Sequence, residues 1–98
     1  MQTITKQARD MSEENGLGEE VNQAYINLVS AEYATAEDAW ESYQGEYSSD
    51  EDFVMQLLDD VGVLPDDLPS YIHIDWESTA RDIMMDYMED NGFYFRNL

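Results

Sequence analysis

Carboxylates are the side chains of this sequence that could do chemistry, because they are numerous and closely spaced. The 98-residue chain has 23 Asp and Glu against four Lys and Arg, which gives a formal net charge of −19. Clustered carboxylates can transfer protons during hydrolysis, bind divalent metal ions, or present negative charge to a basic partner. The neighbouring residues decide among these three roles.

Catalysis and metal binding find little support in the sequence. The chain has one histidine, His73, and no cysteine, so nucleophile–base pairs and zinc–thiolate sites have almost no residues to use. A calcium loop needs glycine at its sixth position, and the cluster that begins with Asp50 and Asp52 lacks one. We therefore expect a protein that is not an enzyme, with no cofactor and no dedicated metal site.

The excess of negative charge excludes two classes of partner. Phosphates of nucleic acids and anionic lipid head groups would repel the chain, so we expect no direct binding to nucleic acid or to a membrane. No apolar run reaches membrane-spanning length and residues 1–10 lack a signal-peptide layout, which predicts a cytoplasmic protein. Because 43% of the residues are apolar and 12% aromatic, we expect folding rather than disorder.

The fold class predicted by the patterning is mainly α with a small β element, that is, a compact helical α+β protein. Thr35, Ser49 and Asp75 are expected N-cap residues, and Gly16, Gly62 and the Asn91-Gly92 pair are expected to end helices. The helices are expected at about 4–15, from about 18 to 29, after 35, over 50–61 with Phe53, Val54, Leu57, Leu58 and Val61 buried, and from 76 to about 90. Short strands are expected near 44–47, 71–74 and 92–96, with a loop over 63–70.

We expect residues 1–98 to form a single acidic domain with a helical N-terminal part, residues 1–36, and a more acidic module, residues 37–98. Several acids fall at predicted helix C-termini, where the helix dipole is also negative. They are Asp59 and Asp60 in one helix and Asp86, Glu89 and Asp90 in the last, in which Asp82 and Asp86 also form a like-charge i, i+4 pair. Such placement without intervening lysines indicates a functional surface, although a solvated face and adaptation to high salt remain alternatives.

The charge can be compared with that of DNA. Duplex DNA carries one negative charge per about 1.7 Å of axis, so nineteen net charges equal the phosphates along roughly 32 Å. Carboxylates three or four residues apart on a helix lie about 5–6 Å from each other, which is close to the spacing of neighbouring phosphates. Such a surface can enter the groove of a basic DNA-binding protein and pair with its Lys and Arg.

Two segments carry a more specific signal. Residues 41–53 read ESYQGEYSSDEDF, and residues 71–82 read YIHIDWESTARD and lead to Asp86-Tyr87 and a closing NGFYFRN at 91–97. Together they resemble the C-terminal part of the ArdA antirestriction family, over about residues 37–98. Members of that family are elongated acidic dimers from plasmids, transposons and phages. They mimic DNA and block type I restriction-modification enzymes by occupying the DNA site.

The resemblance implies that this chain is a homodimeric DNA mimic whose partner is the basic DNA-binding protein of a bacterial defence complex. It assigns phosphate mimicry to Glu46, Asp50, Glu51, Asp52, Asp75, Glu77, Asp82 and Asp86. On the basis of charge alone, we add Asp59, Asp60, Glu89 and Asp90 to these residues.

The resemblance leaves the N-terminal α/β module of the family unmatched, so a shorter mimic is expected. A shorter mimic opens one alternative, an anti-CRISPR protein that blocks target-DNA and PAM recognition by a Cas effector. An alternative of another class is an acidic adaptor or chaperone for basic proteins.

Overall fold

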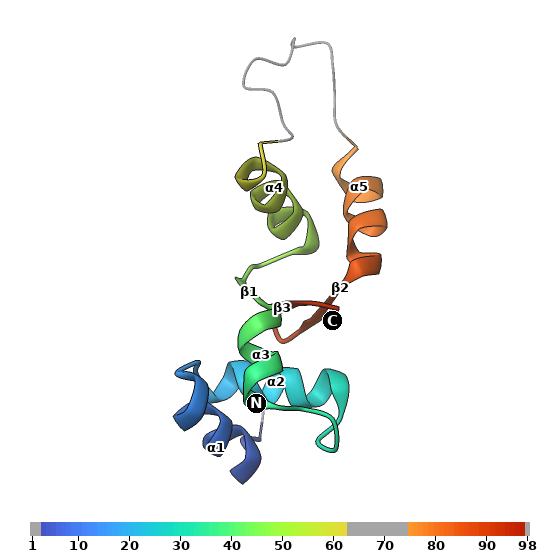
Figure 1. Cartoon of the computed structure of the whole chain (residues 1–98). Coiled ribbons are helices and arrows are strands. Elements are labelled where there is room, and N and C mark those ends of the chain that lie inside the picture. Colours follow the sequence, from blue (N-terminus) through green and yellow to red (C-terminus); the bar gives the residue numbers. More distant parts are fainter. Residues whose placement is uncertain (1–2, 63–74, 98) are drawn as a thin grey trace.

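The computed structural model describes residues 3–62 and 75–97, which form helices and strands in a mixed order (Figure 1). Within these ranges the elements are α1 (Lys6–Asn15), α2 (Glu19–Val29), α3 (Ala36–Ser42), β1 (Tyr43–Glu46), α4 (Asp50–Asp60), α5 (Trp76–Ile83), the 3-10 turn η1 (Met84–Asp86), β2 (Tyr87–Asp90) and β3 (Phe93–Arg96). This order confirms the α+β class. The predicted loop at 63–70 and the strand at 71–74 lie outside the described residues.

Side-chain capping fixes where the helices begin, as the sequence predicts. Thr35, Ser49 and Asp75 each accept a hydrogen bond of 3.1 Å from the backbone N–H three residues later. Each bond satisfies a donor that has no partner within its own helix. Gly16 ends α1 in the left-handed conformation, at φ 76°.

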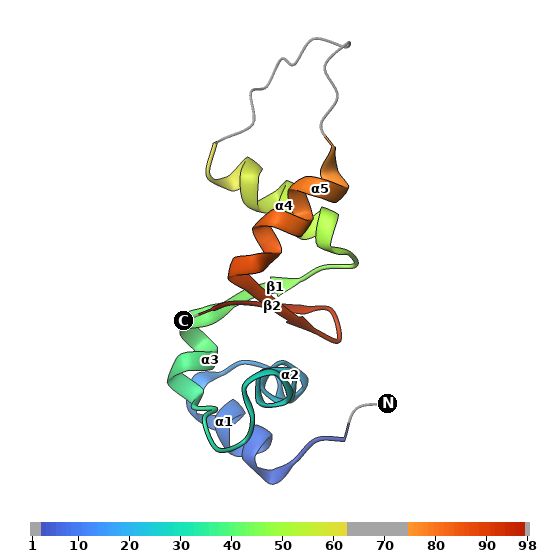
Figure 2. The same ribbon diagram turned by 90° about the vertical axis from the view of Figure 1, so that its right-hand side faces the viewer.

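The three strands form an antiparallel sheet in the order β1-β3-β2. Asn91 and Gly92 connect β2 to β3 with φ values of 53° and 86°, as a tight two-residue hairpin turn requires. β3 is the central strand, and helices cover the sheet on both sides: α1, α2 and α3 lie on one side, α4 and α5 on the other (Figures 1 and 2).

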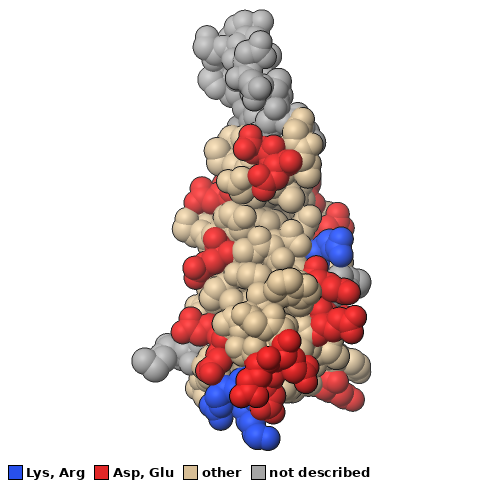
Figure 3. Space-filling view, turned by 60° about the vertical axis from the view of Figure 1, so that its left-hand side comes forward, with Lys and Arg blue, Asp and Glu red and all other residues tan. Residues whose placement is uncertain are grey.

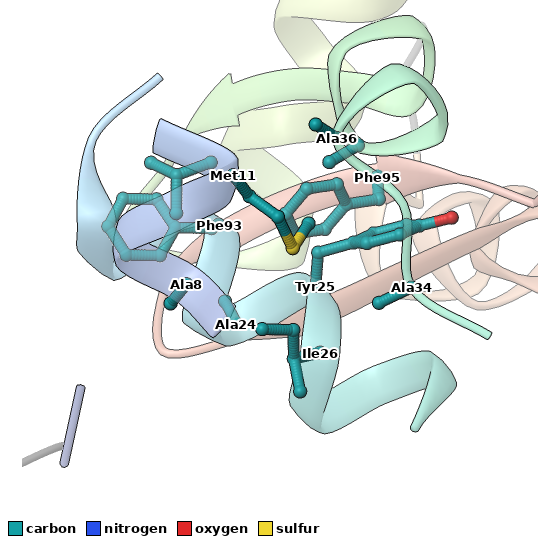
Figure 4. Close-up of a cluster of buried hydrophobic side chains, with 11 residues drawn as sticks. Ala8, Met11, Ala24, Tyr25, Ile26, Ala34, Ala36, Phe93 and Phe95 are labelled. Carbon is teal, nitrogen blue, oxygen red and sulfur yellow. The ribbon is translucent and has the colours of Figure 1, made fainter. Parts of the chain in front are cut away.

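Successive side chains of β3 point to opposite faces of the sheet, and this divides the core into two clusters. Phe93 and Phe95 pack into a cluster with residues of α1 and α2, including Met11 and Tyr25 (Figure 4). Tyr94 points to the opposite side and packs in a second cluster with Phe53, Val54 and Ala80. The body that results is elongated, with principal extents of 52 × 22 × 21 Å.

The end of the last helix was predicted wrongly. α5 stops at Ile83, η1 follows, and Tyr87 to Asp90 form β2 instead of further helical turns. The cause is that Tyr87 continues the apolar i, i+3 and i, i+4 stripe of α5 and also fits the alternation of a strand. The Asn91-Gly92 turn decides for the strand because it pairs β2 with β3 along its whole length.

Val61 is a second difference. It was expected on the buried face of α4, but it follows the last helical residue and is 61% exposed. Phe53 and Val54 are buried, and Leu57 and Leu58 are partly buried against the second core cluster.

Candidate partner-binding surface

Acidic side chains extend along the length of the molecule. Figure 3 shows a face whose two borders carry acidic residues from one end to the other, with uncharged residues between them. Bases are few: Lys6 and Arg9 both lie on α1, Arg81 is on α5, and Arg96 is on β3. Outside α1, therefore, little positive charge interrupts the acidic surface.

Ten of the twelve sequence-predicted site residues are exposed, and the other two, Glu51 and Asp90, are partly buried. Most lie on the α4–α5 side of the sheet. Glu46 is in β1, and α4 carries Asp50, Glu51, Asp52, Asp59 and Asp60. Asp75 caps α5, which carries Glu77 and Asp82. Asp86 is in η1, and β2 carries Glu89 and Asp90.

Seven of these carboxylates already have a partner inside the protein. Asp50 accepts from the Tyr94 phenol at 2.6 Å, and Glu89 accepts from the Gly92 backbone N–H at 2.8 Å in the hairpin turn. The remaining pairs are Asp52 with Ser48, Asp60 with Gln56, Asp75 with Ser78, Asp90 with Asn27, and Glu77 with Arg81. These acids contribute to local structure as well as to surface charge.

The other five carboxylates have no partner among the described residues, and we call them uncommitted; the seven above are called committed. Among the described residues, none makes a hydrogen bond or an ion pair with the side-chain carboxylate of Glu46, Glu51, Asp59, Asp82 or Asp86. Such groups can accept hydrogen bonds from a partner without breaking bonds within the chain. This division could not be predicted from sequence spacing, because it depends on which side chains the fold brings near each acid.

Acids occupy the C-terminal end of α4 as predicted, whereas the acids expected at the end of the last helix lie beyond α5. Asp59 and Asp60 are the last two residues of α4, where the dipole is unfavourable, while Asp50, Glu51 and Asp52 form its favourable first turn. Glu89 and Asp90 lie in β2, where no dipole penalty applies to them, and Asp86 ends the 3-10 turn η1, so it does not form the α-helical pair with Asp82 that was predicted.

Two titrating groups reflect these contacts. Hydrogen bonds from the backbone N–H and the hydroxyl of Ser78 lower the pKa of the Asp75 carboxyl, as expected for a helix cap. Burial raises the pKa of Tyr94, and the hydrogen bond to Asp50 raises it further. Both pKa shifts come from contacts that stabilise the fold, a helix cap and a buried tyrosine.

Sequence reasoning overlooked the acids of the N-terminal layer. Glu37 and Glu41 are exposed on α3 and stand at i, i+4, a like-charge spacing that costs a helix roughly 0.2–0.5 kcal/mol. The sequence contains the signal that could have found them, because Glu37 and Glu41 have the same like-charge i, i+4 spacing as Asp82 and Asp86.

The described residues contain no group of three or more His, Asp or Glu that could hold a metal ion. Nor does any helix among them have the length and apolarity needed to cross a membrane.

The model of the family described as antirestriction protein (ArdA) matches residues 1–95. The chain belongs to the ArdA antirestriction family. The match starts at the first residue, so it includes α1, α2 and α3 as well as the segment 37–98 that carries the sequence resemblance. The ArdA family assigns the chain an antirestriction function, directed at restriction-modification. Comparison with curated proteins and with solved structures found no significant match.

Proposed function

We propose that this ArdA protein is a DNA mimic that inhibits a type I restriction-modification enzyme by occupying its DNA-binding site. The observation that carries the proposal is the elongated body with exposed carboxylates along both borders of one face (Figure 3). Its 52 Å length corresponds to about 15 base pairs of duplex at 3.4 Å per base pair. Its 22 × 21 Å cross-section is rod-like, as a groove built for duplex DNA requires.

The carboxylates would replace phosphates in contacts with Lys and Arg of the enzyme. Glu46, Glu51, Asp59, Asp82 and Asp86 are the best suited, because their carboxylates have no partner among the described residues. The nineteen net charges equal the phosphates of roughly 32 Å of duplex and are spread over a longer body, so the mimic is less densely charged than DNA. A homodimer would place a second set of charges in the same site and extend the contact along the DNA path.

A competition experiment tests the mechanism. A type I methyltransferase core is bound to a labelled duplex and titrated with the protein at two salt concentrations. We expect displacement of the duplex, with an apparent affinity that falls steeply as salt increases, because the contacts are ionic. Displacement with the same affinity at both salt concentrations would point to an apolar interface, and absence of displacement would contradict the proposal. Sedimentation of the free protein at the same concentrations tests the homodimer.

A further inference from the structure

Trp40 is a large apolar side chain that the fold leaves in solvent. It is 60% exposed on α3, whose other side buries Ala36, Ala39 and Ser42. The second tryptophan, Trp76, is partly buried against the α4–α5 core cluster. Exposed tryptophan is uncommon on a protein surface and is enriched among the residues that dominate binding energy at interfaces.

Carboxylates stand beside this indole. A surface hollow is lined by Glu14 and Asn15 from the end of α1 and by Ala36, Glu37 and Trp40 from α3. α1 and α3 are neighbours in the N-terminal layer (Figures 1 and 2). Glu14 and Glu37 are exposed, and the carboxylate of neither forms a hydrogen bond or an ion pair with any described residue.

Asn15 holds the two helices in a fixed relation. Its Nδ2 donates to the carbonyl oxygen of Ala36, the first residue of α3, at 3.0 Å, and to Asn22 Oδ1 at 2.8 Å. Its Oδ1 accepts from the Leu17 backbone N–H at 3.0 Å. The two helices that line the hollow are therefore held together before any partner binds, and binding does not have to bring them together.

We propose that this hollow receives an arginine side chain of the protein partner. Its guanidinium would stack on the Trp40 indole while its N–H groups donate to Glu14 and Glu37. An aromatic face attracts a cation, tryptophan most strongly, and the planar guanidinium both stacks on rings and donates to carboxylates. The proposal rests on the proposed function, since it takes the partner to be a basic DNA-binding protein.

A neighbouring hollow makes a useful contrast. It shares Glu14 but is also lined by Lys6 and Asp10, which form an ion pair at 3.7 Å. The Lys6 ammonium would repel an incoming cation, so the Trp40 hollow is the better receptor. Stacking on an indole is a contact that DNA phosphates do not provide, and this part of the interaction would contribute affinity that persists as salt increases.

The first test uses the duplex-displacement assay with full-length variants. We expect Trp40→Ala to weaken displacement about tenfold at every salt concentration, leaving the salt dependence unchanged. Glu14→Gln combined with Glu37→Gln should weaken displacement and also make its salt dependence shallower. Tyr33→Ala is the matched control, because Tyr33 is another aromatic side chain, 69% exposed, that does not line the hollow; its effect should stay within twofold. An effect of Trp40→Ala within twofold would overturn the proposal.

The second test does not depend on the restriction enzyme. The indole N–H resonances of the free protein are followed by NMR during titration with N-acetylarginine methylamide and, in parallel, with its uncharged citrulline analogue. We expect the Trp40 resonance to shift with the arginine compound alone, the Trp76 resonance to stay unchanged, and the shift to disappear in the Glu14→Gln, Glu37→Gln variant.

Failure of the two proposals can be told apart. If the protein does not displace duplex but the Trp40 shift is present, the proposed function is wrong and the arginine site stands. If duplex is displaced but the effect of Trp40→Ala stays within twofold, the arginine site is wrong and the proposed function stands. Equal melting temperatures of the variants and the parent protein would exclude misfolding as the cause of any loss.

Discussion

The Tyr94 phenol donates a 2.6 Å hydrogen bond to Asp50 Oδ1, which joins the central strand of the sheet to the first residue of α4. Tyr94 is 2% exposed and stacks on Phe53 with ring centroids 4.6 Å apart. Asp50 itself is exposed. One of the carboxylates assigned to phosphate mimicry is therefore also the anchor of a buried tyrosine.

We predict that Tyr94→Phe lowers the free energy of unfolding by about 1–2 kcal/mol, because a hydrogen bond to a charged acceptor is lost while the ring packing is kept. Binding of the restriction enzyme should be unchanged, since the Asp50 carboxylate remains. Urea denaturation and the displacement assay measure the two quantities. A loss of binding without a loss of stability would show that Tyr94 acts at the interface.

Stability should fall at high pH. Burial, followed by the influence of nearby acids, raises the pKa of Tyr25, Tyr43 and Tyr94 above 10.0. Above pH 10 the unfolded chain loses these protons more readily than the folded protein does, so their stabilising contribution is complete below pH 10 and decreases as the pH rises further. Each such tyrosine makes the free energy of unfolding fall by up to about 1.4 kcal/mol for each pH unit above 10.

Tyr94→Phe serves as the control for this pH dependence. Its free energy of unfolding should decline less steeply between pH 10 and pH 11.5 than that of the parent protein. The slopes should differ by up to about 1.4 kcal/mol per pH unit, which corresponds to one proton. Parallel curves for the two proteins, measured by urea denaturation across that range, would contradict the assignment to Tyr94.

Two acids of α4 should respond oppositely to neutralisation. Asp59→Asn should stabilise the protein by a few tenths of a kcal/mol, because Asp59 is at the negative end of the helix dipole and its carboxylate has no partner among the described residues. Asp52→Asn should destabilise it by about 0.5–1 kcal/mol, because Asp52 is in the first turn and accepts a 2.6 Å hydrogen bond from Ser48. Melting temperatures that move in the same direction would refute the dipole argument.

Committed and uncommitted carboxylates should differ in their effect on partner binding. A triple variant of uncommitted acids, Glu46→Gln, Asp82→Asn and Asp86→Asn, should lose about tenfold in affinity and keep its melting temperature.

The charge-matched control neutralises three acids that have partners, Asp52→Asn, Asp75→Asn and Glu89→Gln. It should lose less affinity and melt at a lower temperature, since each of these acids accepts a hydrogen bond within the chain. Equal affinity losses in the two triples would mean that only net charge matters, as expected for an adaptor with a diffuse acidic surface.

Local signals predicted much of the fold. The caps at Thr35, Ser49 and Asp75 are decided by side chains that bond to their own backbone, so a few adjacent residues contain the necessary information. β2 was missed because residues 84–90 continue the stripe of α5, and only pairing with β3 selects the strand. An Asn-Gly pair next to an apolar closing segment is a hairpin signal that deserved more weight than the helical stripe.

The sequence predicted which residues form the candidate surface. It did not predict which of their carboxylates accept hydrogen bonds from other residues of the chain. Asp50, Asp90 and Glu46 look equivalent in sequence. The fold places Asp50 beside Tyr94 and Asp90 beside Asn27, 44 and 63 residues away, while Glu46 receives no such neighbour among the described residues. Contacts over such separations depend on the complete topology.

The position of β3 between two cores has a consequence for folding kinetics. Phe93 and Phe95 complete the core on one side and Tyr94 completes the core on the other, so neither helical layer can finish folding before this strand docks. β3 pairs with β1, which lies far earlier in the chain, and contacts of such sequence separation form slowly. Docking of β3 should therefore be the rate-limiting step, and both layers should gain protection from amide hydrogen exchange in the same kinetic phase.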